Sequence, residues 1–195
     1  MPRAKSFDPD VALDRAVEQF WRAGYDGTSM VQLLESMGIS RQSLYDTFGD
    51  KHRLFLAALD RYRAMVGQGL RAKLEQPEAP LEGLRVGFAW VREQVLDDPE
   101  HRSCLMANAA LELGQHDEEV RARVATHLAD TEELFFATLE RARARGELNE
   151  TQDTRALARF LTTTIHGLGI MARGGASEAA LDDSIELTLG AVVDP

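Results

Sequence analysis

Apolar residues recur every three or four positions along most of the chain, a spacing typical of amphipathic α-helices. Within residues 28–55 these repeats are short and separated by tight turns. Gly38 marks the end of one short helix, because glycine takes the left-handed cap conformation without steric cost. Ser40 can cap the next helix by accepting from its free backbone N–H groups. In that helix Leu44 and Phe48 form the buried stripe.

The side chains opposite this stripe are those of Arg41, Gln42, Ser43 and Tyr45. A helix this short is not stable by itself, so its outward position needs an external reason. A short helix held outward after a tight turn is how many proteins present side chains to the major groove of DNA. The pattern therefore favours a helix-turn-helix unit.

The rest of the chain keeps the helical spacing, with breaks at glycine, proline and aspartate and no convincing strand. Asp8 or Asp10 can cap a first helix. Ser29 with Gln32 has the pattern of a capping box, and Asp50 can cap a long fourth helix. After a break at residues 76–80, we expect helices at residues 81–96, 101–113, 117–145, 153–173 and 177–192. The predicted fold class is all-α, with about nine helices.

Composition sets broad limits on the class of protein. The 195 residues suffice for one or two domains with a real core. The single cysteine excludes an intramolecular disulfide, which fits a reducing compartment. No stretch approaches the ~20 apolar residues of a membrane helix. Residues 1–10 lack the apolar core of a signal peptide. We therefore expect a cytoplasmic protein without a membrane partner.

The net charge of −10 argues at first against a nucleic-acid partner. The acidic residues are unevenly distributed, however. Residues 1–53 hold seven basic and eight acidic side chains, whereas the remainder holds 15 basic and 24 acidic ones. A few local cations and helix-terminal amides can still bind phosphate. We expect DNA binding of modest affinity with a shallow salt dependence.

Many residues of the helix-turn-helix segment agree, at fixed spacing, with one known family. They are Gly24-Tyr25, Thr28-Ser29, Met37-Gly38-Ile39-Ser40, Leu44-Tyr45, Phe48 and Gly49-Asp50-Lys51. Over roughly residues 8–60 the chain resembles the N-terminal domain of the tetracycline-repressor (TetR/AcrR) family. It departs from the family at Leu34, where alanine is more usual, and at Asp46 and Thr47, which replace a basic or aromatic pair. Asp46 repels phosphate, but it could accept from a cytosine amino group.

The resemblance implies a DNA-binding domain at residues 1–53 and a ligand-binding and dimerisation domain at residues 54–195. The fourth helix, at about residues 50–74, would connect them. The implied function is that of a transcriptional regulator, a repressor rather than an activator, which leaves a palindromic operator when a small molecule binds. A coupling of ~1–3 kcal/mol between the two sites would suffice for such release. No enzymatic activity and no cofactor are expected.

Two chemistries carry the predicted recognition of DNA. Arginine can bond guanine bidentately, and glutamine can do so with adenine. Backbone amides at the start of the fourth helix can anchor a phosphate. The residues expected to contact DNA are Arg3, Lys5, Thr28, Ser40, Arg41, Gln42, Ser43, Tyr45, Lys51 and His52. The alternative is that these are only solvated residues on a small helical bundle.

Because one helix-turn-helix reads few base pairs, two copies are expected to pair about a two-fold axis. The apolar stripes of the last two helices are the candidate dimer interface: Leu157, Phe160, Leu161, Ile165, Leu168, Leu181, Ile185, Leu189 and Val192. Gly167 and Gly169 could permit close backbone approach. The alternative is that these stripes are core packing within one chain.

By resemblance, the middle helices should surround a pocket for the effector. An apolar cavity with a few polar groups is the usual form of a small-molecule site. The candidate pocket residues are Phe88, Trp90, Val91, Cys104, Met106, Asn108, Phe135, Phe136, Thr163, His166 and Met171. Each of them could instead belong to the core.

Cys104 has a second possible role. It is expected at the start of a helix beside His101 and Arg102, where a helix dipole and nearby cations would favour the thiolate. Some members of the resembling family sense electrophiles or oxidants through a cysteine, and this remains an alternative to a buried small hydrophobe. The five histidines show no metal-ligand spacing with one another or with the cysteine, so no metal site is predicted.

Two other functions compete with that of a transcriptional regulator. A thiol enzyme could pair Cys104 with His101, His116 or His127 as a base. No catalytic signature supports this, and the helix-turn-helix segment would be unexplained. A helical small-molecule carrier that does not bind DNA is the other competitor.

Overall fold

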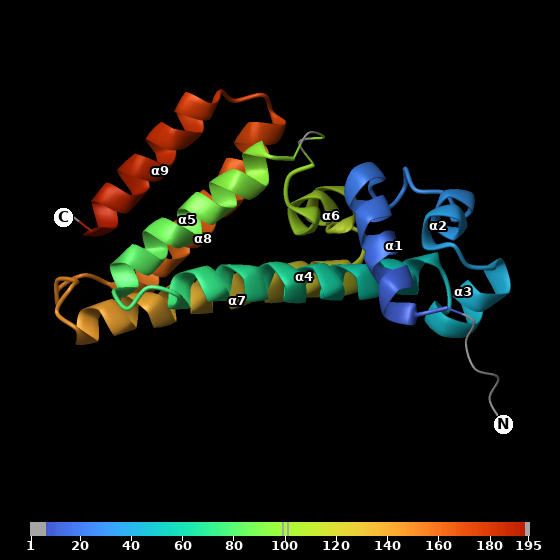
Figure 1. The fold of residues 1–195 in the computed structure, drawn as a ribbon, viewed down its shortest axis with the longest axis horizontal. Helices are drawn as coiled ribbons and strands as arrows, with labels where there is room; N and C mark the ends of the chain where they lie inside the picture. Colours follow the sequence, from blue (N-terminus) through green and yellow to red (C-terminus); the bar gives the residue numbers. More distant parts are fainter. Residues whose placement is uncertain (1–6, 99, 101, 194–195) are drawn as a thin grey trace. The chain divides into compact units, whose positions relative to one another are not determined.

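The structure, a computed structural model, describes residues 7–98, 100 and 102–193. Over these residues the chain forms helices and no strand (Figure 1). The helices are α1 (Pro9–Ala23), α2 (Met30–Met37), α3 (Arg41–Phe48), α4 (Lys51–Glu75), α5 (Pro80–Leu96), α6 (Leu105–Leu113), α7 (Glu118–Ala144), α8 (Thr154–Arg173) and α9 (Glu178–Val193). This confirms the predicted all-α class and its number of helices. Among the residues described, no helix is both long and apolar enough to cross a membrane.

The helices group into two compact units. The first comprises the described residues up to Ala64 together with Leu105–Val124, and the second comprises Met65–Cys104 and the described residues from Ala125 onward. Both α4 and α7 therefore run from one unit into the other. The predicted division at residue 53 assigned residues 105–124 to the C-terminal domain, whereas their packing lies with the N-terminal helices.

The caps of the first three helices have the predicted chemistry. Asp8 caps α1 by accepting from the backbone N–H of Asp10. Ser29 and Gln32 form a complete capping box at the start of α2. Gly38, with φ at 66°, ends α2 in the left-handed conformation that favours glycine. These local signals fix where α2 ends and where α3 starts.

The core of the first unit is built around aromatic rings. Phe20 of α1 meets Phe55 of α4 edge-on at 4.9 Å between ring centroids, and Tyr25 lies 5.0 Å from Phe55. Leu33 of α2 and Leu44 of α3 are fully buried in this unit. The inward side of each short helix is therefore anchored, as the apolar spacing predicted.

Helix α6 starts later than predicted. The expected helix at residues 101–113 begins only at Leu105, because Ser103 has a φ of 62°. That left-handed backbone conformation cannot continue a right-handed helix. Cys104 consequently lies just before α6.

The second unit has one continuous apolar core formed by α5, α7, α8 and α9 with the end of α4. Figure 1 shows α5 and α8 running alongside each other, with α9 beside them. Phe88 of α5 and Phe135 of α7 stack at 5.9 Å and are fully buried. This core holds α8 with one face inward, and that face determines which side chains are left on the surface.

Candidate nucleic-acid interface

Helix α3 presents a polar face to the surface of the first unit. Leu44 is fully buried, whereas Arg41 and Gln42 are exposed and Tyr45 is 45% exposed. The predicted orientation of the helix is therefore confirmed. Guanidinium, carboxamide and phenol groups on one exposed helical face are the groups that can bond base edges and phosphates.

Gln42 is held by its neighbour one helical turn later. Its Nε2 donates to Oδ1 of Asp46 at 2.8 Å. The Oε1 atom and the second Nε2 hydrogen are not required for this bond, so the amide keeps one donor and one acceptor for a base edge. Asp46, at which the chain departs from the usual family pattern, thus orients the Gln42 side chain, which is expected to bond adenine.

Ser40 and Ser43 serve the start of α3. The Ser40 Oγ accepts from the Ser43 backbone N–H at 3.1 Å, and the two hydroxyls lie 3.0 Å apart. Ser40 is exposed and Ser43 is partly so. Both hydroxyls are engaged in the cap, and their contact with DNA stays a prediction.

Thr28 is not part of this surface. Its side chain is fully buried, and its Oγ1 donates to the carbonyl oxygen of Gly24 at 2.6 Å. The hydroxyl satisfies the end of α1 inside the fold, and the expected place of Thr28 near the DNA backbone stays a prediction. Spacing alone could not distinguish this role from a surface one.

The start of α4 contributes Lys51 and His52, both partly exposed and each with a neighbour of its own. The Lys51 ammonium lies 4.2 Å from the centre of the Tyr25 ring. The His52 Nε2 lies 2.6 Å from Oδ2 of Asp117. His52 is thereby turned toward the start of α7, and its predicted contact with DNA stays a prediction. Arg3 and Lys5, also predicted to contact DNA, lie outside the described residues.

Asp117 is an N-cap as well as the partner of His52. Its Oδ1 accepts from the backbone N–H groups of Glu119 and Val120. Burial raises the pKa of the Asp117 carboxyl, but the hydrogen bonds from Val120, His52 and Glu119 outweigh it and leave the pKa below its ordinary value. The carboxylate therefore stays ionised at neutral pH and holds the start of α7 in the first unit.

Glu112 of α6 is a second carboxylate that accepts hydrogen bonds from two backbone N–H groups in the first unit. Its carboxylate accepts from the backbone N–H of Tyr25 at 2.9 Å and from that of Asp26 at 2.7 Å. Gly24, with φ at 74°, allows this approach, since a Cβ there would lie 2.9 Å from Glu112 Oε2. The turn after α1 is thus held by a residue almost ninety positions further along the chain.

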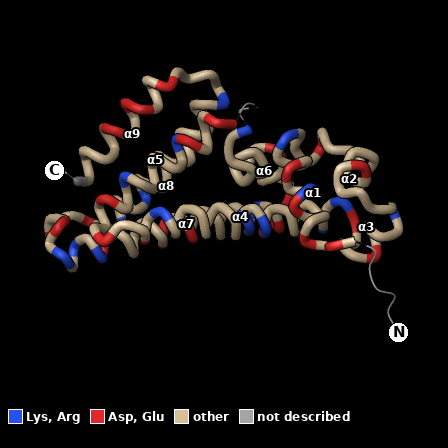
Figure 2. The backbone as a smooth tube through the Cα atoms, viewed as in Figure 1, with Lys and Arg blue, Asp and Glu red and all other residues tan. Residues whose placement is uncertain are grey.

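Charge on the described chain is mixed rather than segregated, and Figure 2 shows acidic and basic positions along both units. With a net charge of −10 over the full sequence, the molecule has no general attraction for DNA. The exposed face of α3 must therefore act through local geometry.

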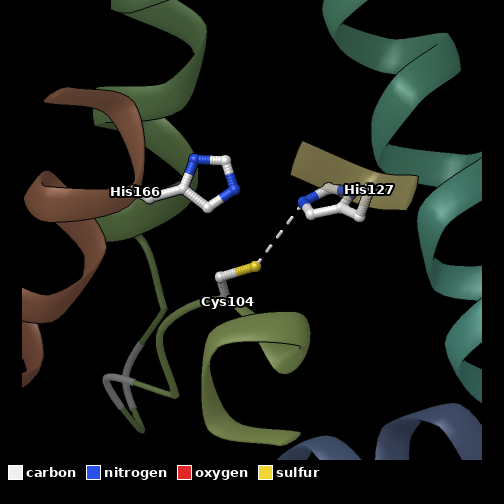
Figure 3. A group of neighbouring side chains, drawn as sticks. All are labelled: Cys104, His127 and His166. Atoms are coloured by element: carbon white, nitrogen blue, oxygen red, sulfur yellow. Dashed lines mark hydrogen bonds between the residues drawn. The ribbon is translucent and has the colours of Figure 1, made fainter. Parts of the chain in front are cut away.

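The second unit brings together three side chains from separate elements: Cys104, His127 of α7 and His166 of α8 (Figure 3). The Cys104 Sγ lies 3.9 Å from His127 Nε2, and the two imidazole rings meet edge-on with centroids 5.3 Å apart. Burial lowers the pKa of His166, partly opposed by its hydrogen bond to Thr162. Sequence reasoning missed this cluster as a unit, because its members are far apart in the chain.

Comparison with known proteins places the chain in a family. Residues 12–58 match the bacterial regulatory proteins of the tetR family, and residues 80–187 match the tetracyclin repressor-like C-terminal domain. The second match covers more than half of the chain.

The chain belongs to the TetR family.

Two curated relatives are similar to this chain over most of their length. It is 36% identical over 190 residues to the uncharacterized HTH-type transcriptional regulator YezE of Bacillus subtilis, which covers 97% of this chain and 98% of that protein. It is 34% identical to the HTH-type transcriptional repressor ComR of Escherichia coli, over 90% of this chain and 84% of that protein. These matches identify it as a DNA-binding transcriptional regulator of the TetR family and not an enzyme.

A solved structure has the same fold together with its DNA. The TetR family transcriptional regulator CifR, as a cysteine mutant complexed with 26-base-pair double-strand operator DNA, matches with a TM-score of 0.86. It is 32% identical, and the match covers 97% of this chain and 99% of that one. The resemblance expected from the helix-turn-helix motif is thereby confirmed along the whole chain.

The predicted effector residues of this TetR chain are spread over both units. Phe88 and Phe135 are buried in the core, and Met106 and Asn108 belong to the first unit. Thr163 lies on the surface, as does Met171. Their role in binding an effector stays a prediction, because apolar spacing identifies buried faces without showing what they face.

The remaining candidates have individual roles. The Trp90 ring packs on α4, where a Cβ at Gly69 would lie 2.8 Å from its Cζ2 atom. Val91 is partly buried against the core. Phe136 is covered by the Arg155 guanidinium, 3.6 Å from its ring centre. Of the predicted set, Phe88 and Phe135 pack on each other in the core. Cys104 and His166 lie close together, with His127 of α7 beside them.

An open hollow of about 380 Å³ does exist in the second unit. It is lined by Arg85, Ala89, Arg92, Asp182, Ile185, Glu186 and Leu189, none of which was predicted to bind an effector. Arg92 and Asp182 are paired to each other within it, with Arg92 Nη2 donating to Asp182 Oδ2 at 2.9 Å. The lining combines apolar side chains with this ion pair, and the hollow is open rather than enclosed.

Most of the predicted dimer residues lie in the core of this TetR subunit instead. Those buried there are Leu161, Ile165, Leu168, Leu181, Leu189 and Val192, with Leu157 and Ile185 packed against the same core. These side chains take part in the core of one chain, while Leu157 and Ile185 remain partly exposed. Phe160 is the exception and is 44% exposed. The role of the set in a dimer stays a prediction.

We predict that the Glu112 carboxylate supports the first unit measurably. Glu112→Ala leaves two backbone N–H groups without their charged acceptor and should lower the free energy of unfolding by about 1.5–3 kcal/mol. Chemical denaturation monitored by circular dichroism measures this. Glu35→Ala, which removes an exposed carboxylate from α2 of the same unit, should change it by less than about 0.5 kcal/mol. Equal effects of the two substitutions would contradict the role given to Glu112.

Proposed function

We propose that this protein is a cytoplasmic repressor that binds a palindromic operator as a homodimer and is released by an effector bound in its second unit. The observation that carries the proposal is the outward polar face of α3, set by the burial of Leu44. The repressors among its relatives and the operator complex of CifR support it.

The chemistry of α3 suggests how sequence is read. Arg41 would bond the O6 and N7 atoms of a guanine, and Gln42 would pair its oriented amide with an adenine. Tyr45 would donate to a phosphate oxygen. Because the chain is acidic overall, few counterions would be released on binding, and affinity would fall only gradually with salt.

We predict that Arg41→Ala and Gln42→Ala relax sequence preference. Each substitution should reduce discrimination against the wrong base by about 1–3 kcal/mol, or roughly 5- to 150-fold. Binding-site selection followed by gel-shift titration of the selected and scrambled duplexes measures it.

Two comparisons sharpen this test. Lys51→Ala should weaken binding to all sequences similarly, because a phosphate contact carries no base information. Arg71→Ala removes an exposed cation from the distal part of α4 and should leave both affinity and preference unchanged. Unchanged specificity in the Arg41/Gln42 double variant would overturn the assignment of α3 as the reading helix.

The dimer face is assigned to the outward side of α8 and α9. Phe160, Ile170 and Met171 are exposed on α8, spaced as one helical face, and Leu187 of α9 is 76% exposed. Gly167 lies between them on α8 with no atom near its Cβ direction, which leaves room for a second helix. Gly169, by contrast, faces Ser103 inside the unit and is not available to a partner.

We predict that Ile170→Glu disrupts the dimer. Two carboxylates would be buried close to the two-fold axis without partners, so the dimer dissociation constant should rise on the order of 100-fold or more. Light scattering coupled to size exclusion over a dilution series measures it. The control is Leu111→Glu, which adds the same charge at an apolar side chain that is 82% exposed in the first unit. A variant at position 170 that remains dimeric at nanomolar concentration would exclude this face.

The route from effector to DNA is proposed to run through Leu105–Val124. This segment belongs to the first unit, yet both of its ends continue into the second. Glu112 and Asp117 connect it to the turn after α1 and to the start of α4. An effector that shifts either end of the segment would therefore act on the elements that hold α3.

A second candidate is thiol sensing by Cys104. Cys104 is partly exposed, and its Sγ lies 3.9 Å from His127 Nε2. An imidazole beside a cysteine is an arrangement found at reactive thiols. Thiolate alkylation would add bulk at the beginning of α6 and disturb the segment just described.

If this candidate holds, Cys104→Ser should abolish release of operator DNA by an alkylating electrophile such as N-ethylmaleimide, while leaving operator affinity within about twofold of the parent. A gel shift with and without the electrophile measures both. Since the chain has a single cysteine, equal release of the parent and the variant would exclude a thiol mechanism.

A further inference from the structure

We propose that Cys104, His127 and His166 form a binding site for a thiophilic transition-metal ion, Zn²⁺ or Cu⁺. One donor atom from each residue lies within 4.8 Å of the other two. One thiolate and two imidazoles form a ligand set that both ions accept. The three ligands come from the residue before α6, from α7 and from α8, all within the second unit.

His166 is oriented as a ligand before any metal binds. Its Nδ1 lies 2.9 Å from the carbonyl oxygen of Thr162, one turn earlier in α8. A carbonyl oxygen can only accept, so Nδ1 carries the proton and the lone pair of the neutral ring is on Nε2. That Nε2 is buried and makes no hydrogen bond among the described residues. A histidine ligand whose other nitrogen donates to a backbone carbonyl is the usual arrangement at metal sites.

The spacing of the donor atoms suits a small shift on binding. Zn–S and Zn–N bonds of about 2.3 and 2.0–2.1 Å at tetrahedral angles place neighbouring donors about 3.3–3.6 Å apart. The Cys104 Sγ and His127 Nε2 are already 3.9 Å apart. Figure 3 shows both imidazoles directed toward the space beside the sulfur. A movement of about 1 Å, within reach of side-chain rotation, would close the site around an ion.

The backbone that carries Cys104 is supported from several sides. Arg102 is paired with Asp98, and Arg173 of α8 donates to the Arg102 carbonyl oxygen at 2.8 Å. Gly169, one turn after His166, lets the Ser103 side chain come close to α8, since a Cβ there would meet Ser103 Oγ at 3.0 Å. The left-handed conformation of Ser103 is thus held by its surroundings, as strained residues next to binding sites are.

An ion at this site would act on the proposed coupling segment. Cys104 directly precedes Leu105–Val124, and His127 follows it by three residues. Joining both to one ion fixes the two ends of the segment that carries Glu112 and Asp117. This regulatory consequence rests on the proposed function, whereas binding of the ion does not.

The test uses the full-length protein, reduced and freed of metal with a chelator. Titration with Zn²⁺ and separately with Cu⁺ under anaerobic conditions, followed by elemental analysis after desalting, should give one equivalent per chain for at least one ion. Titration with Co²⁺, as a spectroscopic substitute for Zn²⁺, should produce a thiolate-to-cobalt charge-transfer band. No ion retained and no such band would overturn the site.

Matched variants assign the ligands. His166→Gln and Cys104→Ser should each weaken binding at least 100-fold, and Cys104→Ser should remove the cobalt band. His116→Gln, at an exposed histidine outside the cluster, should bind as the parent does. Unchanged affinity in His166→Gln with a native circular-dichroism spectrum would overturn the proposal. If a ligand variant does not fold, the Tm of the parent and of His116→Gln is measured with and without metal. A metal-induced rise in the Tm of both proteins supports the site. No rise in the Tm of the parent overturns it.

Operator binding separates the site from the proposed function. A gel shift of the parent with and without the bound ion should show at least a fivefold change in affinity that is absent from His166→Gln. Stoichiometric metal with no change in operator affinity supports the site and overturns its regulatory role. Failure to bind any operator sequence contradicts the proposed function, while the metal titrations still decide the site.

Discussion

The Glu112 carboxylate is the contact on which the organisation of the first unit depends. It accepts from two successive backbone N–H groups in the turn that follows α1, and Gly24 gives it the space to do so. Hydrogen bonds to a charged acceptor are stronger than those between neutral groups, so this turn and α6 are stabilised together. Through that contact a segment from the middle of the chain becomes part of the DNA-binding unit. A boundary drawn by sequence order alone cannot show this.

Much of the local structure could be predicted from the sequence, because caps and apolar stripes are local signals. Gly38, Ser40 and the capping box of α2 have their expected conformations. The partners of a buried face are a different matter. Thr28 was expected to contact DNA, and the inner stripe of α8 was expected to contact a second copy of the chain. Periodicity shows which side of a helix is buried, but it does not show which element covers that side. The cluster of Cys104 with two histidines was missed because its ligands lie on three separate elements. Sequence spacing can indicate a metal site only when its ligands lie on the same element.

Acidity and DNA binding are compatible here because recognition depends on a small surface. The acidic excess lies mainly beyond residue 53, so it affects the long-range field more than the contacts of α3. Such a protein approaches DNA without strong attraction and must rely on close fit once there. The same property limits binding to unrelated sequences, since that binding is almost entirely electrostatic.

The hydrogen bond between Gln42 and Asp46 bears on how fast the protein would bind and leave DNA. A carboxamide fixed before contact loses little conformational freedom when it meets its base, which improves the match to the right sequence. If α3 reads DNA as proposed, the carboxylate that fixes Gln42 would also repel the nearby phosphates and shorten the lifetime of every complex. Such a regulator would discriminate well yet depart quickly, so that transcription could respond soon after conditions change.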